Sequence, residues 1–243
     1  MKPPPAADRD RSLLRVATYN VRDFLDDRSA AARVVRAIEP DVLCLQEVPR
    51  RLTTEVRLPS FARECGLYWA GRRRGTGGTA VLTALRVNVH AASAHRLGVR
   101  FPDRTRGYAG LEVSLPGTRP VTVVSVHLGL RADERESHAH AIVSRLGPHA
   151  IIAGDLNEGD GGRAFACLAS RYRLVSPPRP TFPSQHPSRV LDVVLAGRDL
   201  EVVPGAEEVL DEADVVAASD HRPVWVDVRL PTTSQPLRSG GYG

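Results

Sequence analysis

The sequence contains a single lysine, Lys2, although its formal net charge is +5 and its calculated pI is about 9.5. A P-loop needs a lysine after its second glycine, and Schiff-base enzymes need a lysine nucleophile. Lys2, at the start of the chain, serves neither role. Arginine therefore carries the positive charge, which is typical either of a polyanion-binding protein or of a coding background rich in GC.

Cysteine is also scarce. Cys44, Cys65 and Cys167 are odd in number and widely spaced, which argues against a disulfide framework or a thiolate zinc site. No apolar run reaches the roughly 18 residues that a membrane span requires. No apolar stretch typical of a secretory signal precedes the first strand-like run. We therefore expect a protein of the reducing cytoplasm.

Several catalytic motifs are missing as well. Neither G-x-S-x-G nor H-E-x-x-H occurs. Ser219, Asp220 and His221 are consecutive, so they cannot form a hydrolase triad with one another. The glycine-rich segment 75–78 precedes a strand-like run instead of following one, which makes it a poor dinucleotide-binding motif.

The pattern along the chain predicts one α/β domain in which strands outnumber helices. The domain is expected over residues 12–231, with a disordered tail at 1–11 and a flexible tail at 232–243. Helical spacing of apolar residues predicts helices at 28–39, 132–147 and 162–170. Alternating and β-branched residues predict strands at 13–21, 41–48, 78–85, 108–115, 121–128, 150–157, 190–196 and 223–230.

Five segments carry an apolar run toward polar residues that bind metals or transfer protons. These residues are Asn20, Glu47, His127, Asp155 with Asn157, and Asp220 with His221. Residues two apart in a strand point to the same face, which would place Asp155 and Asn157 side by side. Carboxylate and amide oxygens suit Mg²⁺ or Mn²⁺ better than zinc. Histidines among carboxylates suit an anionic substrate whose transition state needs positive charge and proton transfer.

Six short motifs follow one another over residues 13–230: TYNV, LQEV, SVHL, GDLNE, RVLDVVL and SDHRPV. In this order they resemble the endonuclease/exonuclease/phosphatase superfamily, which includes deoxyribonuclease I, apurinic endonucleases, neutral sphingomyelinases and inositol polyphosphate 5-phosphatases. Thr181, Phe182 and Pro183 also match a TFP motif that smaller bacterial members often carry before the LD strand. The resemblance implies a four-layer α/β sandwich of two packed mixed β-sheets flanked by helices, with the site at one end.

The resemblance implies a metal site and a catalytic group. Glu47 matches the principal magnesium ligand, Asn20 a residue beside the metal, and Asp220 a further metal-site carboxylate. Mg²⁺ or Mn²⁺ is therefore the expected cofactor.

For catalysis, Asp155 matches the group that orients or deprotonates the attacking water, and Asn157 holds the phosphate or metal nearby. His221 matches the histidine that contacts the phosphate, and Asp192 its orienting carboxylate. His127 matches the histidine on the leaving-group side in the deoxyribonuclease and sphingomyelinase branches. A structural role stays open for two of them: Asp192 as a buried acid with a partner, and His127 as a capped strand end.

Substrate contacts are less sharply defined. Arg106, in RTRGYAG, lies where many members have a phosphate-facing arginine, although Arg100 and Arg104 are close alternatives. The arginine run 72–74 and these three arginines would suit the backbone of DNA or RNA, and a solvated loop is the alternative for 72–74. The apurinic branch has aromatic residues where Thr76 and Val193 fall, which argues against abasic-site repair.

The predicted function is a divalent-metal-dependent hydrolase of phosphoester bonds, with a phosphodiesterase or nuclease as the leading interpretation. The alternative is a phosphatase or phosphodiesterase of small molecules or lipids. A non-catalytic binding module is a remote third possibility, because none of the six motifs is eroded. We expect the protein to act as a monomer on a phosphoester substrate.

Overall fold

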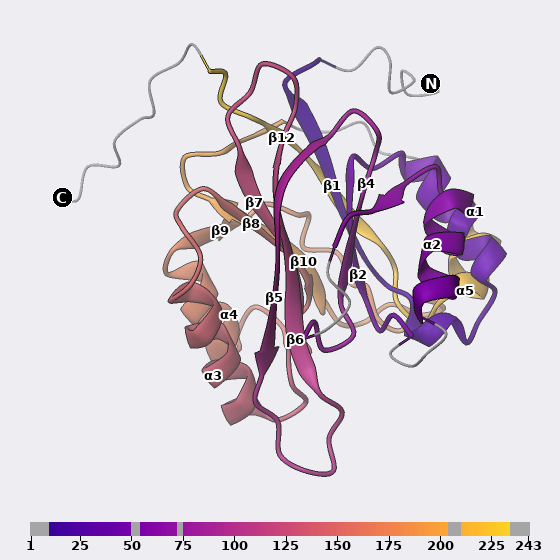
Figure 1. The fold of residues 1–243 in the computed structure, drawn as a ribbon. Helices are drawn as coiled ribbons and strands as arrows, with labels where there is room; N and C mark the ends of the chain where they lie inside the picture. Colours follow the sequence, from indigo (N-terminus) through magenta and orange to yellow (C-terminus); the bar gives the residue numbers. More distant parts are fainter. Residues whose placement is uncertain (1–9, 50–53, 72–74, 204–209, 234–243) are drawn as a thin grey trace.

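The computed structural model describes residues 10–49, 54–71, 75–203 and 210–233 (Figure 1). Of the two predicted tails, only residues 10–11 and 232–233 lie among them. There, Asp10 pairs with Arg229 of the last strand, and the Thr233 amide donates to the Gly117 carbonyl. No helix in these ranges is long and apolar enough to cross a membrane.

Two six-stranded β-sheets form the centre of the fold. Both are mixed, because β1 runs parallel to β2 and β7 parallel to β8 while the other pairings are antiparallel. The first sheet has the order β11 (Glu201–Val203), β12 (Val224–Arg229), β1 (Leu13–Asn20), β2 (Val42–Gln46), β4 (Ala80–Thr83), β3 (Tyr68–Trp69). The second has the order β5 (Asn88–Leu97), β6 (Arg106–Ser114), β7 (Val121–His127), β8 (Ala150–Asp155), β10 (Asp192–Gly197), β9 (Tyr172–Leu174).

Helices cover the outer face of each sheet, which confirms the expected four layers (Figure 1). The first sheet carries α1 (Arg28–Ile38), α2 (Thr54–Glu64) and α5 (Glu212–Ala218), and a 3-10 helix, η2 (Arg22–Phe24), follows β1. The second sheet carries α3 (Ala132–Val143) and α4 (Arg163–Ala169). One apolar cluster lies under each helical layer and a third lies between the sheets.

Both faces of β1 are buried, as its position in a central layer requires. Leu14 and Val16 face the cluster between the sheets, whereas Ala17 and Tyr19 face the helices, because successive residues of a strand point to opposite sides. The polar residue Arg15 is buried too, and its Nε lies 2.8 Å from Asp227 Oδ1 on β12. The ion pair provides the partner that a buried charge needs.

A small group of buried polar side chains joins the two sheets. Gln46, at the end of β2, donates from Nε2 to Ser125 Oγ on β7 at 3.0 Å. Ser125 Oγ donates in turn to the Leu45 carbonyl at 2.8 Å, and Thr18 Oγ1 donates to Gln46 Oε1 at 3.1 Å. These bonds satisfy the Gln46 amide inside an otherwise apolar layer.

All the predicted strands and helices are present, with shifted ends. The helix predicted to reach residue 147 ends at Val143, and Ser144 is its C-cap residue, with its amide on the His140 carbonyl. The sequence did not predict α2, α5, η2, β3, β5, β9 or β11.

Candidate active site

Strand ends from both sheets meet and carry the polar residues that the sequence singled out. In the first sheet, Asn20 ends β1 and Glu47 directly follows β2. In the second sheet, His127 and Asp155 are register partners at the ends of the parallel strands β7 and β8. Asp192 begins the antiparallel strand β10 opposite Asp155. These two registers bring His127, Asp155 and Asp192 to one edge of the second sheet, and Asn20 of the first sheet reaches Asp155 there.

Asn20 links the carboxylates of the two sheets. Its Nδ2 lies 3.4 Å from Glu47 Oε1 and 3.1 Å from Asp155 Oδ2. Its Oδ1 accepts the Arg22 amide at 3.1 Å, which fixes the amide orientation. Asn20 thus donates to both carboxylates and bridges them without neutralising their charge.

Glu47 has the features of a ligand for a hard cation. Its φ of 50° is positive, a conformation that costs about 1–3 kcal/mol in a non-glycine residue and concentrates at functional sites. Its side chain is 28% exposed. Among the described residues, its ion-pair contact within 4.0 Å is His127 Nε2, at 4.0 Å, and the charge of Arg106 acts on it from farther away.

Asp155 is buried and surrounded by donors. Its Oδ1 accepts the Asn157 amide at 2.8 Å, and its Oδ2 lies 3.5 Å from His127 Nε2. Burial, and then the nearby charge of Asp192, raises the pKa of Asp155 to about 7. A carboxyl group that titrates near neutrality can accept a proton during a reaction.

His221 is held by Asp192. Its Nδ1 lies 2.8 Å from Asp192 Oδ2, and its Nε2 lies 3.8 Å from Asp155 Oδ2. Burial acts to lower the pKa of His221, but the carboxylates of Asp192 and Asp155 outweigh it and raise the pKa to about 9. The imidazole is therefore a cation at neutral pH that donates from both nitrogens.

The TFP segment supports this pair. Thr181 Oγ1 donates to Asp192 Oδ2 at 2.6 Å and accepts the amides of Leu191 and Asp192, each at 3.2 Å. The Phe182 ring packs on the His221 ring with centroids 4.9 Å apart. One residue of the motif therefore orients the carboxylate and the next orients the histidine.

Two groups of side chains have donor atoms suited to a metal ion. Ligand atoms of Asp155, Asp192 and His221 lie within 4.8 Å of one another. A metal bound there would have to displace the hydrogen bond between Asp192 and a protonated His221. The Glu47 carboxylate with its neighbour Asn20 has no such competing cation and fits Mg²⁺ or Mn²⁺ better.

Arg106, the first residue of β6, lies beside the site. Its Nε donates to the Leu128 carbonyl at 3.0 Å, and Asn157 Nδ2 donates to the same oxygen at 3.0 Å. Burial lowers the pKa of Arg106, while the charges of Glu47 and Asp155 oppose that effect. Gly77 packs against this residue so closely that an added Cβ would lie 2.1 Å from the Arg106 carbonyl carbon.

The geometry of the Asp155–Asn157 pair differs from the side-by-side strand arrangement that the sequence predicted. Strand β8 ends at Asp155, and Asn157 has a φ of 54°, so the two do not alternate along one strand. They meet because the Asn157 amide turns back to the Asp155 carboxylate.

Other predicted residues lie farther out. Asp220 is 37% exposed, and its Oδ2 lies 3.5 Å from Arg22 Nε; within the described residues, no hydrogen bond joins it to Glu47. Arg100 pairs with Asp133 at 2.7 Å, and Arg104 pairs with Asp23 at 2.7 Å. The arginine run 72–74 lies outside the described residues.

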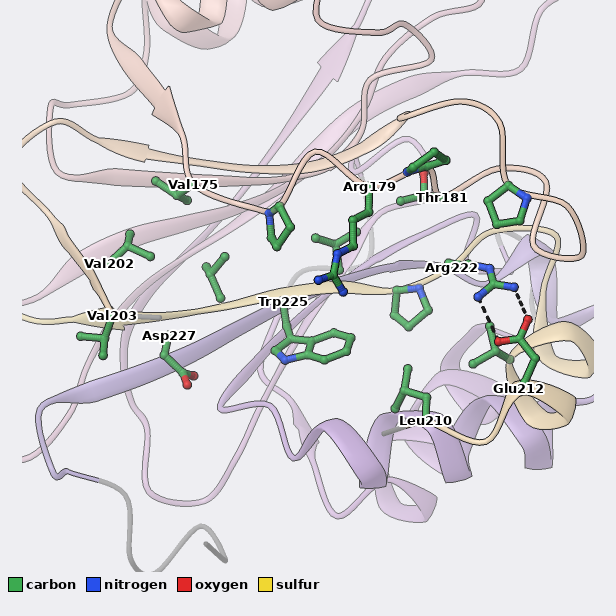
Figure 2. Close-up of a pocket in the computed structure, with 17 residues that line it drawn as sticks. Val175, Arg179, Thr181, Val202, Val203, Leu210, Glu212, Arg222, Trp225 and Asp227 are labelled. Atoms are coloured by element: carbon green, nitrogen blue, oxygen red, sulfur yellow. Dashed lines mark hydrogen bonds and ion pairs between the residues drawn. The ribbon is translucent and has the colours of Figure 1, made fainter. Parts of the chain in front are cut away.

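A cavity of about 710 Å³ lies outside the group of strand-end residues, along β12 and the segment that leads to Thr181 (Figure 2). Its walls are mostly valine, proline and Trp225, and the charged groups Arg222 and Glu212 pair with each other (Figure 2). This cavity contains neither Glu47 nor Asp155, so the candidate site at the strand ends lies outside it.

Comparison of the sequence with known protein families identifies one family. The sequence model of the endonuclease/exonuclease/phosphatase family matches residues 17–221. The chain belongs to this family. No curated protein sequence matches it significantly.

Solved structures show the same fold as this family member. An endonuclease/exonuclease/phosphatase from Beutenbergia cavernae is 20% identical with a TM-score of 0.70, covering 90% of this chain and 72% of that one. A mannosyl-6-phosphatase from Bacteroides thetaiotaomicron is 17% identical with a TM-score of 0.70, covering 88% and 99%. ANGEL2, a 2′,3′-cyclic phosphatase, is 13% identical with a TM-score of 0.65, covering 89% and 95%.

Three contributors to the site were not predicted as site residues. Thr181 orients Asp192, and Ser219 Oγ donates to the Asn20 carbonyl at 2.7 Å while accepting the His221 amide at 3.2 Å. The Leu128 carbonyl joins Arg106 to Asn157. The TFP motif was the available signal for Thr181, whereas a backbone carbonyl leaves no signal in the residue type.

Proposed function

We propose that this family member is a phosphoester hydrolase that depends on Mg²⁺ or Mn²⁺ and uses a water molecule for in-line attack on phosphorus. One observation carries the proposal. A half-exposed carboxylate, Glu47, and a buried one, Asp155, both bond to the amide of Asn20 at 3.4 and 3.1 Å. In this proposal the first carboxylate holds the cation and the second accepts the proton.

Glu47, with Asn20 and Asp220 as further candidates, would hold the cation, which would neutralise negative charge on the phosphoryl oxygens. Asp155 orients the attacking water and accepts its proton, a role that its pKa of about 7 supports. The Asn157 amide at Asp155 Oδ1 keeps that carboxylate fixed.

Side chains of the protein supply further hydrogen-bond donors and positive charge to the phosphoryl group. His221, held by Asp192, donates from Nε2 to a phosphoryl oxygen. His127 lies on the side of the leaving group and contacts it. Arg106 and Asn157, tied together through the Leu128 carbonyl, bind the remaining phosphoryl oxygens. Such fixed donors stabilise charge that develops in the transition state.

A phosphodiesterase or nuclease that cleaves DNA or RNA is the leading form of this proposal, supported by the basic charge of the chain. Hydrolysis of small phosphoesters is the second candidate. It is favoured by the ion pairs of Arg100 and Arg104, which place a carboxylate next to two of the arginines that a nucleic acid would need. The cytoplasmic location and the monomeric state stay predictions from the sequence.

The test is a screen of plasmid DNA, RNA and small phosphomonoesters and phosphodiesters with Mg²⁺ or Mn²⁺, beside a sample in excess EDTA. Glu47→Ala should abolish turnover of every substrate that the native chain cleaves. Glu112→Ala, which removes an exposed glutamate from β6, serves as the matched control. Full turnover in EDTA, or an active Glu47→Ala variant, would contradict the metal-dependent mechanism.

A further inference from the structure

The short helix η2 has an unusual backbone beside the candidate site. Its three residues, Arg22 to Phe24, have φ values of 45°, 56° and 52°. This left-handed conformation is rare outside glycine, and such outliers concentrate at functional sites. Only Val21 separates η2 from Asn20, and the Arg22 amide donates back to Asn20 Oδ1 at 3.1 Å. The unusual turn therefore begins next to a candidate metal ligand.

Contacts on two sides hold this turn in place. The Asp23 amide donates to the Glu47 carbonyl at 2.6 Å. The Phe24 ring is buried and packs on the Phe61 ring, with centroids 4.7 Å apart. The backbone of Asp23 is therefore fixed relative to Glu47, and its position in the turn determines where its side chain starts.

The Asp23 side chain reaches across to the second sheet. Its Oδ2 lies 2.7 Å from Arg104 Nη1. Arg104 lies on the loop between β5 and β6, which projects at the bottom of the view in Figure 1. Arg104 and Arg106 both line a cleft of about 260 Å³, and Arg106 is the proposed phosphate-binding arginine. The ion pair therefore lies at the mouth of the proposed site.

Asp23 compensates a charge that a substrate could otherwise use. The Arg104 side chain is 66% exposed, and Asp23 is its one ion-pair partner among the described residues. An arginine beside the phosphoryl site is suited to bind a second phosphate group of a substrate. A carboxylate on the guanidinium competes with that phosphate and repels it. Asp23 thus reduces what a substrate with several phosphates gains from Arg104.

Two neighbouring arginines have acidic partners as well. Arg131 Nε lies 3.1 Å from Asp103 Oδ2, and Arg100 Nη2 lies 2.7 Å from Asp133 Oδ1. Asp103 lines the same cleft as Arg104. Positive charge around the cleft is therefore compensated locally. Such a rim suits a substrate with one phosphate group better than a polyanion, which needs uncompensated positive charge along its backbone.

We infer that Asp23 is a specificity-determining residue: by compensating the charge of Arg104, it makes the site favour phosphoesters with one phosphate group over substrates with several. This inference rests on the proposed phosphoester hydrolysis and names the charge class of its substrate. Of the two candidate forms of that function, it favours the hydrolysis of small phosphoesters. Asp23 acts through Arg104 and takes no part in the chemical step.

The test compares substrates that differ in the number of phosphate groups: hexyl phosphate with hexanediyl bisphosphate, and a dinucleotide with a decanucleotide. Asp23→Asn keeps the shape of the side chain, and asparagine tolerates a left-handed backbone. In this variant, the ratio of kcat/KM for the substrate with several phosphates to that for the substrate with one should rise about 2- to 5-fold at low salt, the scale of one exposed charge pair. The rise should shrink at high salt, because salt screens exposed charges.

A combined variant tests whether the effect runs through Arg104. Asp23→Asn with Arg104→Gln removes both charges of the pair, so the ratio should return to its native value. A rise that persists in the combined variant would overturn the inference, because Arg104 would then not be the group that the substrate uses.

Asp214→Asn is the matched control. The Asp214 side chain is 21% exposed, against 22% for Asp23, and it pairs with Arg33 between α1 and α5. The substitution makes the same change in net charge and should leave the ratio unchanged. An equal rise in this variant would assign the effect to overall charge and overturn the role of Asp23.

Two further results separate this inference from the proposed function. An unchanged ratio in Asp23→Asn, with the single-phosphate substrates still hydrolysed, would overturn the inference and leave the proposed function standing. If the native chain hydrolyses none of these substrates, the proposed function fails, and calorimetric binding of the same compounds decides the role of Asp23. Tighter binding of the bisphosphate by Asp23→Asn would support that role, whereas equal or absent binding would overturn it.

Discussion

Replacement of Thr181 by valine isolates the support beneath Asp192. Valine keeps the shape of threonine and removes only the hydroxyl, which donates to Asp192 Oδ2 at 2.6 Å and accepts two amides at 3.2 Å. Thr181 is 2% exposed, so water does not replace the missing bonds easily. The variant therefore leaves a buried carboxylate and two amides with fewer partners.

The expected cost follows from these bonds. A hydrogen bond to a charged group contributes about 1.5–3 kcal/mol, so Thr181→Val should lower the free energy of unfolding by at least about 2 kcal/mol. Thr181→Ser keeps the hydroxyl and loses one methyl group, which costs about 1 kcal/mol. Because Asp192 orients His221, Thr181→Val should also lower kcat more than Thr181→Ser does.

Urea unfolding followed by circular dichroism measures the free energies, and saturating substrate with the metal measures kcat. Equal destabilisation by valine and serine would refute the reasoning, since it would assign the role of Thr181 to packing. A stable Thr181→Val variant with native kcat would also refute the reasoning, because Asp192 would then orient His221 without the hydrogen bond from Thr181.

Three further tests concern catalysis, nucleic acid and pH. Asp155→Asn should lower kcat and kcat/KM together by at least about 100-fold, since an amide accepts no proton; an unchanged kcat with a raised KM would remove Asp155 from catalysis. Alanine at 72–74 should reduce the salt slope of DNA or RNA binding by about 0.9 for each duplex phosphate that the variant no longer neutralises, and intact DNA and RNA after incubation with Mn²⁺ at low salt would exclude a nuclease. Burial lowers the pKa of His138, so the unfolded chain takes up the proton first and stability should fall as the pH drops below about 6.5. In urea titrations at several pH values, His138→Gln should reduce the fall in stability below about pH 6.5. An unaltered fall in this variant would show that His138 does not cause it.

The strands that the sequence predicted are those with strong apolar patterns. β1 and β8 are buried along nearly their whole length, which makes them visible as apolar runs. β5 is largely exposed or half-buried at the edge of its sheet, so neither alternation nor an apolar run marks it. α2 contains Pro59, which normally argues against a helix interior. α5 has only seven residues, too few for a clear period.

The candidate site was predictable where a residue type itself carries the chemistry. Glu47, Asp155 and His221 stand in motifs of a known order, and the structure brings them close together. The partners that orient them were not predictable in the same way, because a hydroxyl such as that of Ser219 has many ordinary roles. Backbone conformation was hidden too, as the positive φ of Glu47 shows.

The Gln46–Ser125 bond has a consequence for the alignment of the two sheets. Apolar contact between sheets is non-directional and tolerates small relative translations, whereas a hydrogen bond of 3.0 Å defines one offset. Asn20 and Glu47 belong to one sheet, and His127 and Asp155 to the other. Core redesign that preserved stability but removed this bond is expected to loosen the alignment of the two halves of the candidate site, which the bond from Asn20 to Asp155 would then help to hold. Stability and the alignment of the site are therefore separable properties of this interior.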